Sequence, residues 1–352
     1  MWTAYAVTFA VAFGISFVLS PVCARLGLRL NVVARPGGRR QHGRVVSRLG
    51  GIALYLGFVG AVLVSQLMSV PRFDPDEPRR LAGLLAGTTI AFLMGLADDR
   101  YELRPGPQYL LQALATAVGM VGLIFIEYVN NPLSSDPNAR IVFPVWLTIG
   151  VTFFWMMGMM QTVNWLDGLD GLAAGVTAIA AIVLFIHSGF RLDPPQQSVS
   201  LLPLALAGAC LGFLPFNFAP ARVFMGGGAY TLGFALGALA IIGGAKVATV
   251  LLVMGIPILD VAFLIVWRRL SGRRPDAGDR HHLHFRLHDM GLSQKTVVLG
   301  YYAFSAAFGA LALIVPPRQY KLLALAVLGL VAAGIFTFTA RRAVPVEESA
   351  QK

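Results

Sequence analysis

The chain has 352 residues, of which 57% are hydrophobic and only 13% are charged. An average soluble domain carries about 25% charged residues, so this composition argues against a soluble enzyme, a disordered protein and a disulfide scaffold. It predicts a polytopic membrane protein. The two cysteines, Cys23 and Cys210, have no metal-ligand spacing, and we interpret them as packing residues.

The charge balance is strongly basic, with 28 Lys and Arg residues against 17 Asp and Glu residues and a net charge of +11. In a soluble protein this excess would suggest nucleic-acid binding. In a membrane chain the simpler interpretation is that Lys and Arg gather in cytoplasmic loops. We therefore expect no nucleic-acid partner, and a basic cytoplasmic face that suits anionic lipids and anionic substrates.

The apolar stretches predict an all-α polytopic membrane protein with about eleven transmembrane helices, because a helix needs about 20 apolar residues to cross a bilayer. An N-terminus outside and a C-terminus inside places most Lys and Arg residues on the cytoplasmic side. We expect one transmembrane domain over 1–340 and a short cytoplasmic tail over 341–352. The expected spans are 2–20, 50–70, 81–97, 107–129, 143–160, 169–188, 200–214, 229–244, 247–267, 297–315 and 321–339.

In this orientation, four polar segments fall at the cytoplasmic ends of spans. The first holds two adjacent carboxylates, Asp98 and Asp99, at the end of an apolar stretch. A carboxylate at the centre of a membrane helix costs at least about 2.5 kcal/mol, and even at helix ends such clustering needs a reason. The pair is either a metal-binding or proton-handling site, or a solvated helix end beside Arg100 and Arg104.

The second segment, from Asn164 to Leu172, holds two Asp-Gly pairs that begin at Asp167 and Asp170. If residues 167–170 form a helical turn, the two carboxylates share a face. Glycine lets the backbone approach a ligand closely. Helix capping is the structural alternative, but two such pairs exceed what a cap needs, so we favour a binding role.

The third segment is a glycine run, Gly226-Gly227-Gly228, which follows Asn217 and opens the next apolar stretch. A glycine-rich turn at the start of a helix offers backbone N–H groups to an anion such as phosphate. A tight turn between two helices is the structural alternative, and the run alone does not separate the two.

The fourth segment is a basic loop with three histidines in four positions, His281, His282 and His284. Histidine and arginine side chains suit a phosphate or a diphosphate, whereas no Cys or paired-His spacing supports zinc. Mg²⁺ prefers one or two carboxylates together with substrate phosphates. Carboxylates and basic groups on one membrane face therefore predict phosphoryl transfer between a soluble nucleotide and a lipid.

These motifs make the chain resemble the polyprenyl-phosphate N-acetylhexosamine-1-phosphate transferases of glycosyl transferase family 4. The resemblance runs from about Arg35 to Leu287, and it implies ten or eleven helices around a catalytic cleft on the cytoplasmic face of the plasma membrane. The histidine segment is similar to the branch of the family that uses UDP-N-acetylglucosamine. The motifs are Arg48-Leu-Gly-Gly51, Asp98-Asp99, Asn164 to Leu172, Phe216 to Gly226, Pro257-Ile-Leu-Asp260, and Asp279 to Leu287.

The resemblance implies transfer of N-acetylglucosamine-1-phosphate, or a close relative of it, from a UDP-sugar to undecaprenyl or another polyprenyl phosphate, with release of UMP. This is the first membrane step of a cell-wall or surface-glycan pathway. It implies Mg²⁺ as cofactor, with Mn²⁺ as an alternative, and it leaves a homodimer open. Asp98 is the candidate base, and Asp260, inside a span, receives no role. The implied catalytic residues are Asp98, Asp99, Asp167 and Asp170; the substrate-binding residues are Asn164, Asn217, Arg280, His282, His284 and Arg286; the metal ligands are Asp99, Asn164 and Asp167.

The chain departs from the family pattern at several site positions. Gly227 stands where the family has a metal-ligating Asp, and this loss should weaken Mg²⁺ binding. Two family lysines appear as Gly106 and Gln108, a third histidine as Phe285, and an Asn as Gln161. A catalytically weakened protein that binds lipid and nucleotide-sugar is therefore an alternative to an active transferase. A polytopic transporter is a further alternative, although its binding groups would lie near the bilayer midplane.

Overall fold

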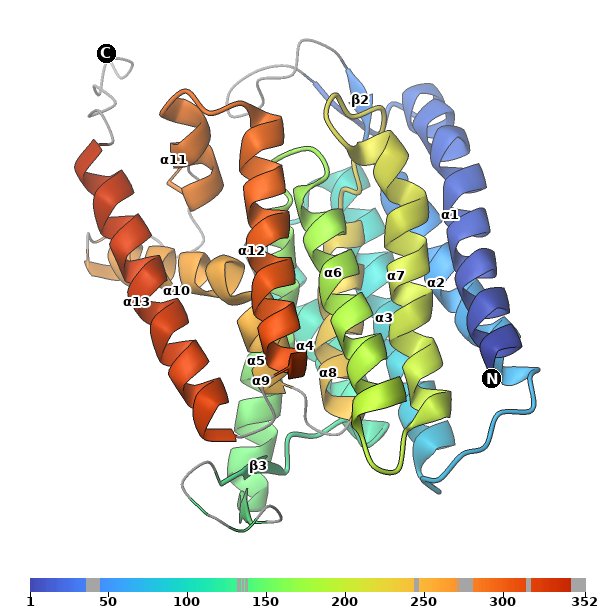
Figure 1. Ribbon diagram of the computed structural model, residues 1–352. Coiled ribbons are helices and arrows are strands. Elements are labelled where there is room, and N and C mark those ends of the chain that lie inside the picture. The colour runs from blue at the N-terminus through green and yellow to red at the C-terminus, as the bar shows by residue number, and fades with distance from the viewer. Residues whose placement is uncertain are drawn as a thin grey trace.

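The computed structural model describes residues 1–35, 45–131, 134, 136, 139–243, 247–270, 272, 281–314 and 318–342. This part of the chain is a bundle of helices that run mostly alongside one another (Figure 1). The helices are α1 (Trp2–Arg29), α2 (Gly50–Gln66), α3 (Glu77–Tyr101), α4 (Pro105–Val121), α5 (Val145–Leu166), α6 (Leu172–Ile186), the π-helical turn η1 (His187–Arg191), α7 (Gln197–Asn217), α8 (Gly228–Ile242), α9 (Val247–Val253), α10 (Gly255–Leu270), α11 (Leu283–Asp289), α12 (Gln294–Ile314) and α13 (Arg318–Arg342).

Two short antiparallel hairpins lie at opposite ends of the bundle. In one, β1 (Val33–Ala34) pairs with β2 (Val46–Ser47); in the other, β3 (Tyr128–Asn130) pairs with β4 (Arg140–Val142). Ser47 in β2 also forms a bridge to Val223, which brings the start of α2 next to the loop before α8.

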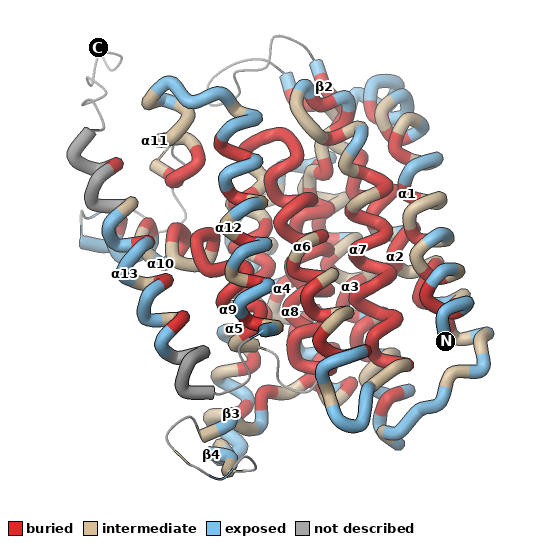
Figure 2. Tube along the Cα trace, in the orientation of Figure 1, coloured by how far each residue is buried: buried red, intermediate tan, exposed pale blue. Residues whose placement is uncertain are grey.

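The centre of the bundle consists of α6, α7 and α8, and every residue of α8 is buried. Figure 2 shows this buried centre in red, with exposed residues on the surrounding helices. Large apolar side chains such as Val18, Phe154 and Leu330 are exposed on α1, α5 and α13. Such apolar outer surfaces suit contact with lipid, as expected for a multi-pass membrane protein.

The structure confirms the predominantly helical fold, and six or seven helical segments of the described residues are candidate spans, so the count of eleven stays a prediction. Six segments are long and apolar enough to cross a membrane: α1, α3, α5, α6 continued by η1, α7 and α12. The pair α9 and α10 makes a seventh if it is counted as one span. α2 and α8 are apolar but shorter, and the expected span 107–129 overlaps the 17-residue α4 and ends inside β3. The inside or outside placement of the termini stays a prediction.

The expected span over 247–267 is divided into two helices, because α9 and α10 meet at an angle of 83°. Pro257 gives the physical reason. It has no N–H to donate to the carbonyl of Val253, the last residue of α9, and its ring clashes with the carbonyl at that position in a continuous helix. As a result α10 runs across the other helices (Figure 1).

Candidate active site

The four polar segments meet at one end of the bundle, where α3 and α5 end and α8 begins (Figure 1). α3 ends at Tyr101, and Glu102 follows in the left-handed conformation. Arg104 is extended because it precedes Pro105, which starts α4. The last turn of α3 therefore presents Asp98 and Asp99 at a sharp reversal of the chain.

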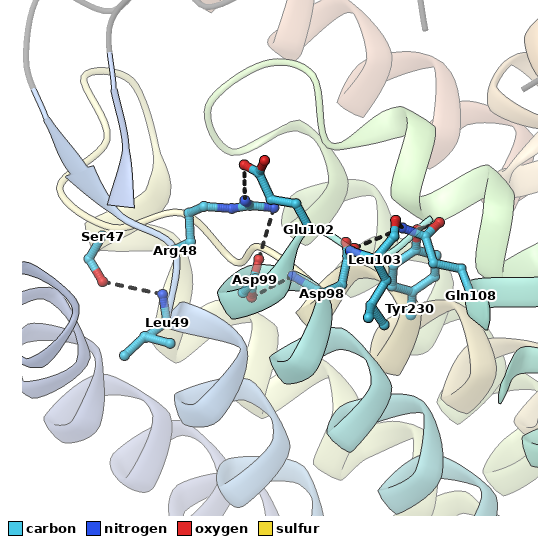
Figure 3. A network of polar contacts seen from close by, with 10 residues as sticks. Ser47, Arg48, Leu49, Asp98, Asp99, Glu102, Leu103, Gln108 and Tyr230 are labelled. Atoms are coloured by element: carbon cyan, nitrogen blue, oxygen red, sulfur yellow. Dashed lines mark hydrogen bonds and ion pairs between the residues drawn. The ribbon is translucent and has the colours of Figure 1, made fainter. Parts of the chain in front are cut away.

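Asp99 is held firmly by groups from two distant segments (Figure 3). One carboxylate oxygen lies 3.0 Å from a guanidinium nitrogen of Arg48, and the other accepts a hydrogen bond of 2.8 Å from the Gly227 N–H. The side chain is almost completely buried. A second guanidinium nitrogen of Arg48 lies 4.0 Å from the exposed carboxylate of Glu102. Asp99 thus joins the start of α2 to the turn before α8.

Asp98 has different partners, although it is adjacent in sequence (Figure 3). Its Oδ1 accepts hydrogen bonds from the Leu103 N–H at 3.0 Å and from Gln108 Nε2 at 2.7 Å. The Tyr230 hydroxyl donates to Gln108 Oε1 at 3.4 Å. Within the described residues no Lys or Arg pairs with Asp98, and the donors that bind its carboxylate are neutral.

The glycine run packs directly against the backbone of α3. A Cβ added to Gly227 would come within 3.0 Å of Gly95 backbone atoms, and a Cβ added to Gly95 would meet Gly227 in the same way. Gly226, at φ +55°, leaves no room for a Cβ beside the Asp99 carboxylate. A carboxylate side chain at position 227 therefore does not fit this packing. The residue contributes its N–H to Asp99 instead.

The segment after α5 forms an irregular turn. The helical turn that would place Asp167 and Asp170 on one face is not formed. Asp170 Oδ2 accepts a hydrogen bond of 2.9 Å from the Ala221 N–H. The amide of Asn217 accepts from the Gly171 N–H at 3.1 Å and donates to the Val223 carbonyl at 3.0 Å. These contacts fasten the turn to the loop after α7.

Asn217 is only 1% exposed. The oxygen and the nitrogen of its amide both bind backbone groups. These described contacts hold two loops together, and none of them indicates a nucleotide contact. Asn164, the other predicted amide contact, is half-buried in the last turn of α5, three residues before Asp167.

Asp167 is half-buried, and its surroundings disfavour the charged form. Burial, reinforced by the negative charges of Asp170 and Asp99, raises the pKa of Asp167 to about 7, and Arg48 opposes this shift. Within the described residues no hydrogen bond reaches the Asp167 carboxylate. A carboxylate in a region of negative charge is a natural ligand for a divalent cation.

The carboxylates of this site suit a divalent cation that is bound partly by the protein and partly by a substrate. Among the described residues no group of three His, Cys, Asp or Glu side chains forms a metal cage. Mg²⁺ typically needs only one or two carboxylates, and substrate phosphates complete its ligands. Asp167 meets this requirement. Asp99 is already paired with Arg48, so its metal role stays a prediction.

The histidine segment packs against the same turn. His284, at the start of α11, lies so close to Gly168 that a Cβ on this glycine would overlap the imidazole ring. The rings of His282 and His284 are stacked with centroids 5.4 Å apart. The Arg286 guanidinium lies 5.5 Å above the Phe263 ring. Arg280, the remaining predicted contact, lies outside the described residues.

Three residues of the site received no role from the sequence: Arg48, Asp260 and Arg268. Asp260 Oδ2 lies 2.8 Å from His282 Nδ1, and its Oδ1 accepts from the Leu283 N–H at 2.9 Å. Arg268 is 1% exposed, and its guanidinium lies 5.1 Å from the ring centroid of Trp165. Asp260 and Arg268 are eight residues apart on the buried face of α10, and charged residues at that spacing in an apolar stretch are the signal that could have identified them.

Comparisons with known proteins cover most of the chain. A family model described as glycosyl transferase family 4 matches residues 81–244. The chain is 34% identical over 314 residues to a decaprenyl-phosphate N-acetylglucosaminephosphotransferase of Mycobacterium tuberculosis, which covers 81% of this chain and 76% of that protein. It is 29% identical over 316 residues to a probable undecaprenyl-phosphate N-acetylglucosaminyl 1-phosphate transferase of Bacillus subtilis, with coverages of 88% and 84%. A phospho-N-acetylmuramoyl-pentapeptide-transferase of Desulforudis audaxviator is 33% identical over 289 residues, with coverages of 75% and 83%.

Proposed function

The chain belongs to glycosyl transferase family 4, and on this basis we propose that it transfers N-acetylhexosamine-1-phosphate from a UDP-sugar to a polyprenyl phosphate. The observation that carries the proposal is that the end of α3, the turn at Asp167 and the histidine segment meet at one end of an apolar bundle. N-acetylglucosamine as the sugar is supported by the names of the relatives from Mycobacterium tuberculosis and Bacillus subtilis. The products are a polyprenyl-diphosphate-sugar and UMP.

In the proposed reaction a phosphate oxygen of the lipid attacks the β-phosphorus of the UDP-sugar. A new P–O bond forms, and the bond from the β-phosphorus to the bridging oxygen breaks, so that UMP leaves with the electron pair. Asp98, held by neutral donors, takes any remaining proton from the lipid phosphate. This single displacement needs no protein nucleophile, and trapping a phosphorylated enzyme in the absence of lipid would contradict it.

Mg²⁺, with Mn²⁺ as the alternative, would be held by Asp167, together with Asn164 and Asp99 as predicted from the sequence, and would stabilise the charge that develops on the diphosphate. His282, His284 and Arg286 would contact the same diphosphate. We place the site at the cytoplasmic face of the plasma membrane, where a soluble UDP-sugar and a lipid phosphate can meet. The reaction would begin a cell-wall or surface-glycan pathway.

The test is lipid-dependent release of UMP by the purified protein with UDP-N-acetylglucosamine, undecaprenyl phosphate and Mg²⁺. We expect Asp98→Asn to lower kcat by about a hundredfold or more, the usual contribution of a general base. Asp76→Asn, the same change at the other end of α3, is the control and should keep full activity.

Absence of UMP release from the wild type with several UDP-sugars would contradict the proposal. Binding of the UDP-sugar without UMP release would instead favour the alternative of a catalytically weakened relative.

A further inference from the structure

Asp260 connects α10 to the histidine segment through both oxygens of its carboxylate. One oxygen binds the imidazole of His282 and the other binds the backbone of Leu283, at 2.8 and 2.9 Å. The Asp260 side chain is almost completely buried, as is that of His282. A buried carboxylate is costly unless it is paired, so this contact gives Asp260 a definite partner.

We propose that Asp260 is a positioning residue that fixes the His282 ring so that its Nε2 meets the diphosphate of the nucleotide-sugar. The proposal rests on the proposed function. An ionised carboxylate only accepts hydrogen bonds, so Nδ1 of His282 carries the hydrogen in this contact. Nε2 is then the ring nitrogen that faces the ligand, and it donates to a phosphate oxygen when the imidazole also carries its second proton.

The surroundings of His282 support this role. Its ring lies edge-on to Trp165, with centroids 5.5 Å apart, and Trp165 immediately follows Asn164. Arg268, from the same face of α10 as Asp260, lies over Trp165. The aromatic ring is thus held between α10 and the histidine segment, next to the turn that carries Asp167.

The bend between α9 and α10 makes the contact geometrically possible. α10 leaves α9 at an angle of 83°, and its end lies beside the end of α5, where Arg268 lies over Trp165. Asp260 lies on this crossing helix, one turn after Pro257. A continuous straight helix in place of α9 and α10 would carry Asp260 in a different direction.

A purely structural role would differ from the proposed one in a measurable way. If Asp260 only stabilised the start of α11 through the Leu283 N–H, its loss would damage the protein whether or not His282 were present. If Asp260 acts through the imidazole, its loss adds little once His282 is gone.

A double-mutant cycle separates these roles. We expect Asp260→Asn and His282→Ala each to lower kcat/KM for UDP-N-acetylglucosamine by about 10- to 100-fold, the usual effect of removing such an orienting partner. The double variant should be no more than about twofold worse than His282→Ala alone. Glu77→Gln, a buried carboxylate that accepts from Ser198 at 2.8 Å at the far end of α3, is the control and should keep full activity. Fully multiplicative losses in the double variant would overturn the proposal.

A second measurement leaves Asp260 intact, and it applies even if Asp260→Asn folds poorly. Nitrogen-15 NMR of histidine-labelled wild type, with His282 assigned by comparison with His282→Gln, reports which ring nitrogen carries hydrogen. A protonated Nδ1 supports the contact, and an unprotonated Nδ1 overturns it. Because this readout does not depend on turnover, failure of the proposed function and failure of this inference are distinguishable.

Discussion

At the scale of single residues, the two adjacent carboxylates at the end of α3 differ because of their partners. Asp99 is neutralised by Arg48 and fixed by the Gly227 N–H, whereas Asp98 is held by the Leu103 N–H and the Gln108 amide. A paired, buried carboxylate suits a positioning role, and one held by neutral donors suits reaction with a substrate. Gln108, at a position where the family has lysine, is therefore a neutral group that orients Asp98 in this chain.

Gln108→Leu tests this orienting group. The change removes one donor from Asp98 and the acceptor of the Tyr230 hydroxyl. One hydrogen bond contributes about 0.5–1.5 kcal/mol, so we expect kcat to fall by up to about tenfold, and the KM for the UDP-sugar to stay nearly constant. Initial rates at varied UDP-N-acetylglucosamine give both values. Gln66→Leu, at the other end of the bundle, serves as the control, and an equal loss there would refute a specific role for Gln108.

The pKa of Asp167, raised to about 7 by burial and by neighbouring negative charges, predicts how Mg²⁺ binding depends on pH. Below pH 7 a proton competes with the cation for the carboxylate, so apparent Mg²⁺ affinity should fall by up to about tenfold for each pH unit. Above pH 7 the affinity should level off. Half-saturating Mg²⁺ concentrations for UMP release between pH 5.5 and 8.5 measure this, and Asp167→Asn should flatten the curve. A flat curve in the wild type would contradict the prediction.

The same shift has a consequence for stability in the absence of Mg²⁺. The folded protein keeps the Asp167 proton up to about pH 7, whereas an unfolded Asp releases it near its ordinary value of 3.8. Because the folded state binds more protons between these two values, this group makes the folded state less stable as the pH rises from about 4 to about 7.

At the scale of secondary-structure elements, close backbone packing joins α3 to the turn before α8. Gly95 and Gly227 face each other with no room for a Cβ on either one. This contact sets the distance between the end of α3 and the Gly227 N–H that binds Asp99. Gly227, at the position where the family has a metal-ligating Asp, therefore serves close packing against Gly95 in this chain.

Gly227→Ala and Gly227→Asp should both destabilise the protein and should not improve activity. Inserting atoms into a filled contact costs about 1–3 kcal/mol, which thermal unfolding in detergent would detect. Gly150→Ala is the matched control, because a Cβ at this position on α5 meets nothing within 4 Å. A Gly227→Asp variant that matched the wild type in stability and exceeded it in activity would show that the turn moves to admit the side chain.

At the scale of the whole molecule, the helices place the candidate site at one end of the bundle, and the sequence predicts that this end is cytoplasmic. Glu102 is exposed beside the site, and Phe73 is exposed before the start of α3 at the opposite end. The native Cys23 and Cys210 are buried, so they should react poorly with a thiol reagent. Single introduced cysteines therefore report the orientation.

In intact cells, a membrane-impermeant maleimide should label Phe73→Cys and should label Glu102→Cys only after the membrane is opened. This result follows from an outside N-terminus, because α1 and α2 return the chain to the outside before α3. The unmodified chain is the control for background labelling. Labelling of Glu102→Cys in intact cells would reverse the predicted orientation.

The helical membrane fold, the enzyme family and the location of the polar segments were all predictable from the sequence. Hydrophobic stretches identify helices because a bilayer requires apolar side chains along the chain itself. The adjacent Asp98 and Asp99, the turn at Asp167 and the histidines are short-range patterns, and they are visible without any partner. The count of eleven spans stays a prediction. Hydropathy does not show where a helix ends or, as at Pro257, where it bends.

The partners of these residues depend on helix packing. Arg48 meets Asp99, Gly227 meets Gly95, and Asp260 meets His282 only because helices distant in sequence lie side by side. Hydropathy and spacing describe one segment at a time, whereas a hydrogen bond between segments depends on how the helices cross. The composition and local motifs of this chain therefore determine its class and family, and its tertiary packing determines which carboxylate is neutralised, which one is available to a substrate and which one positions a histidine.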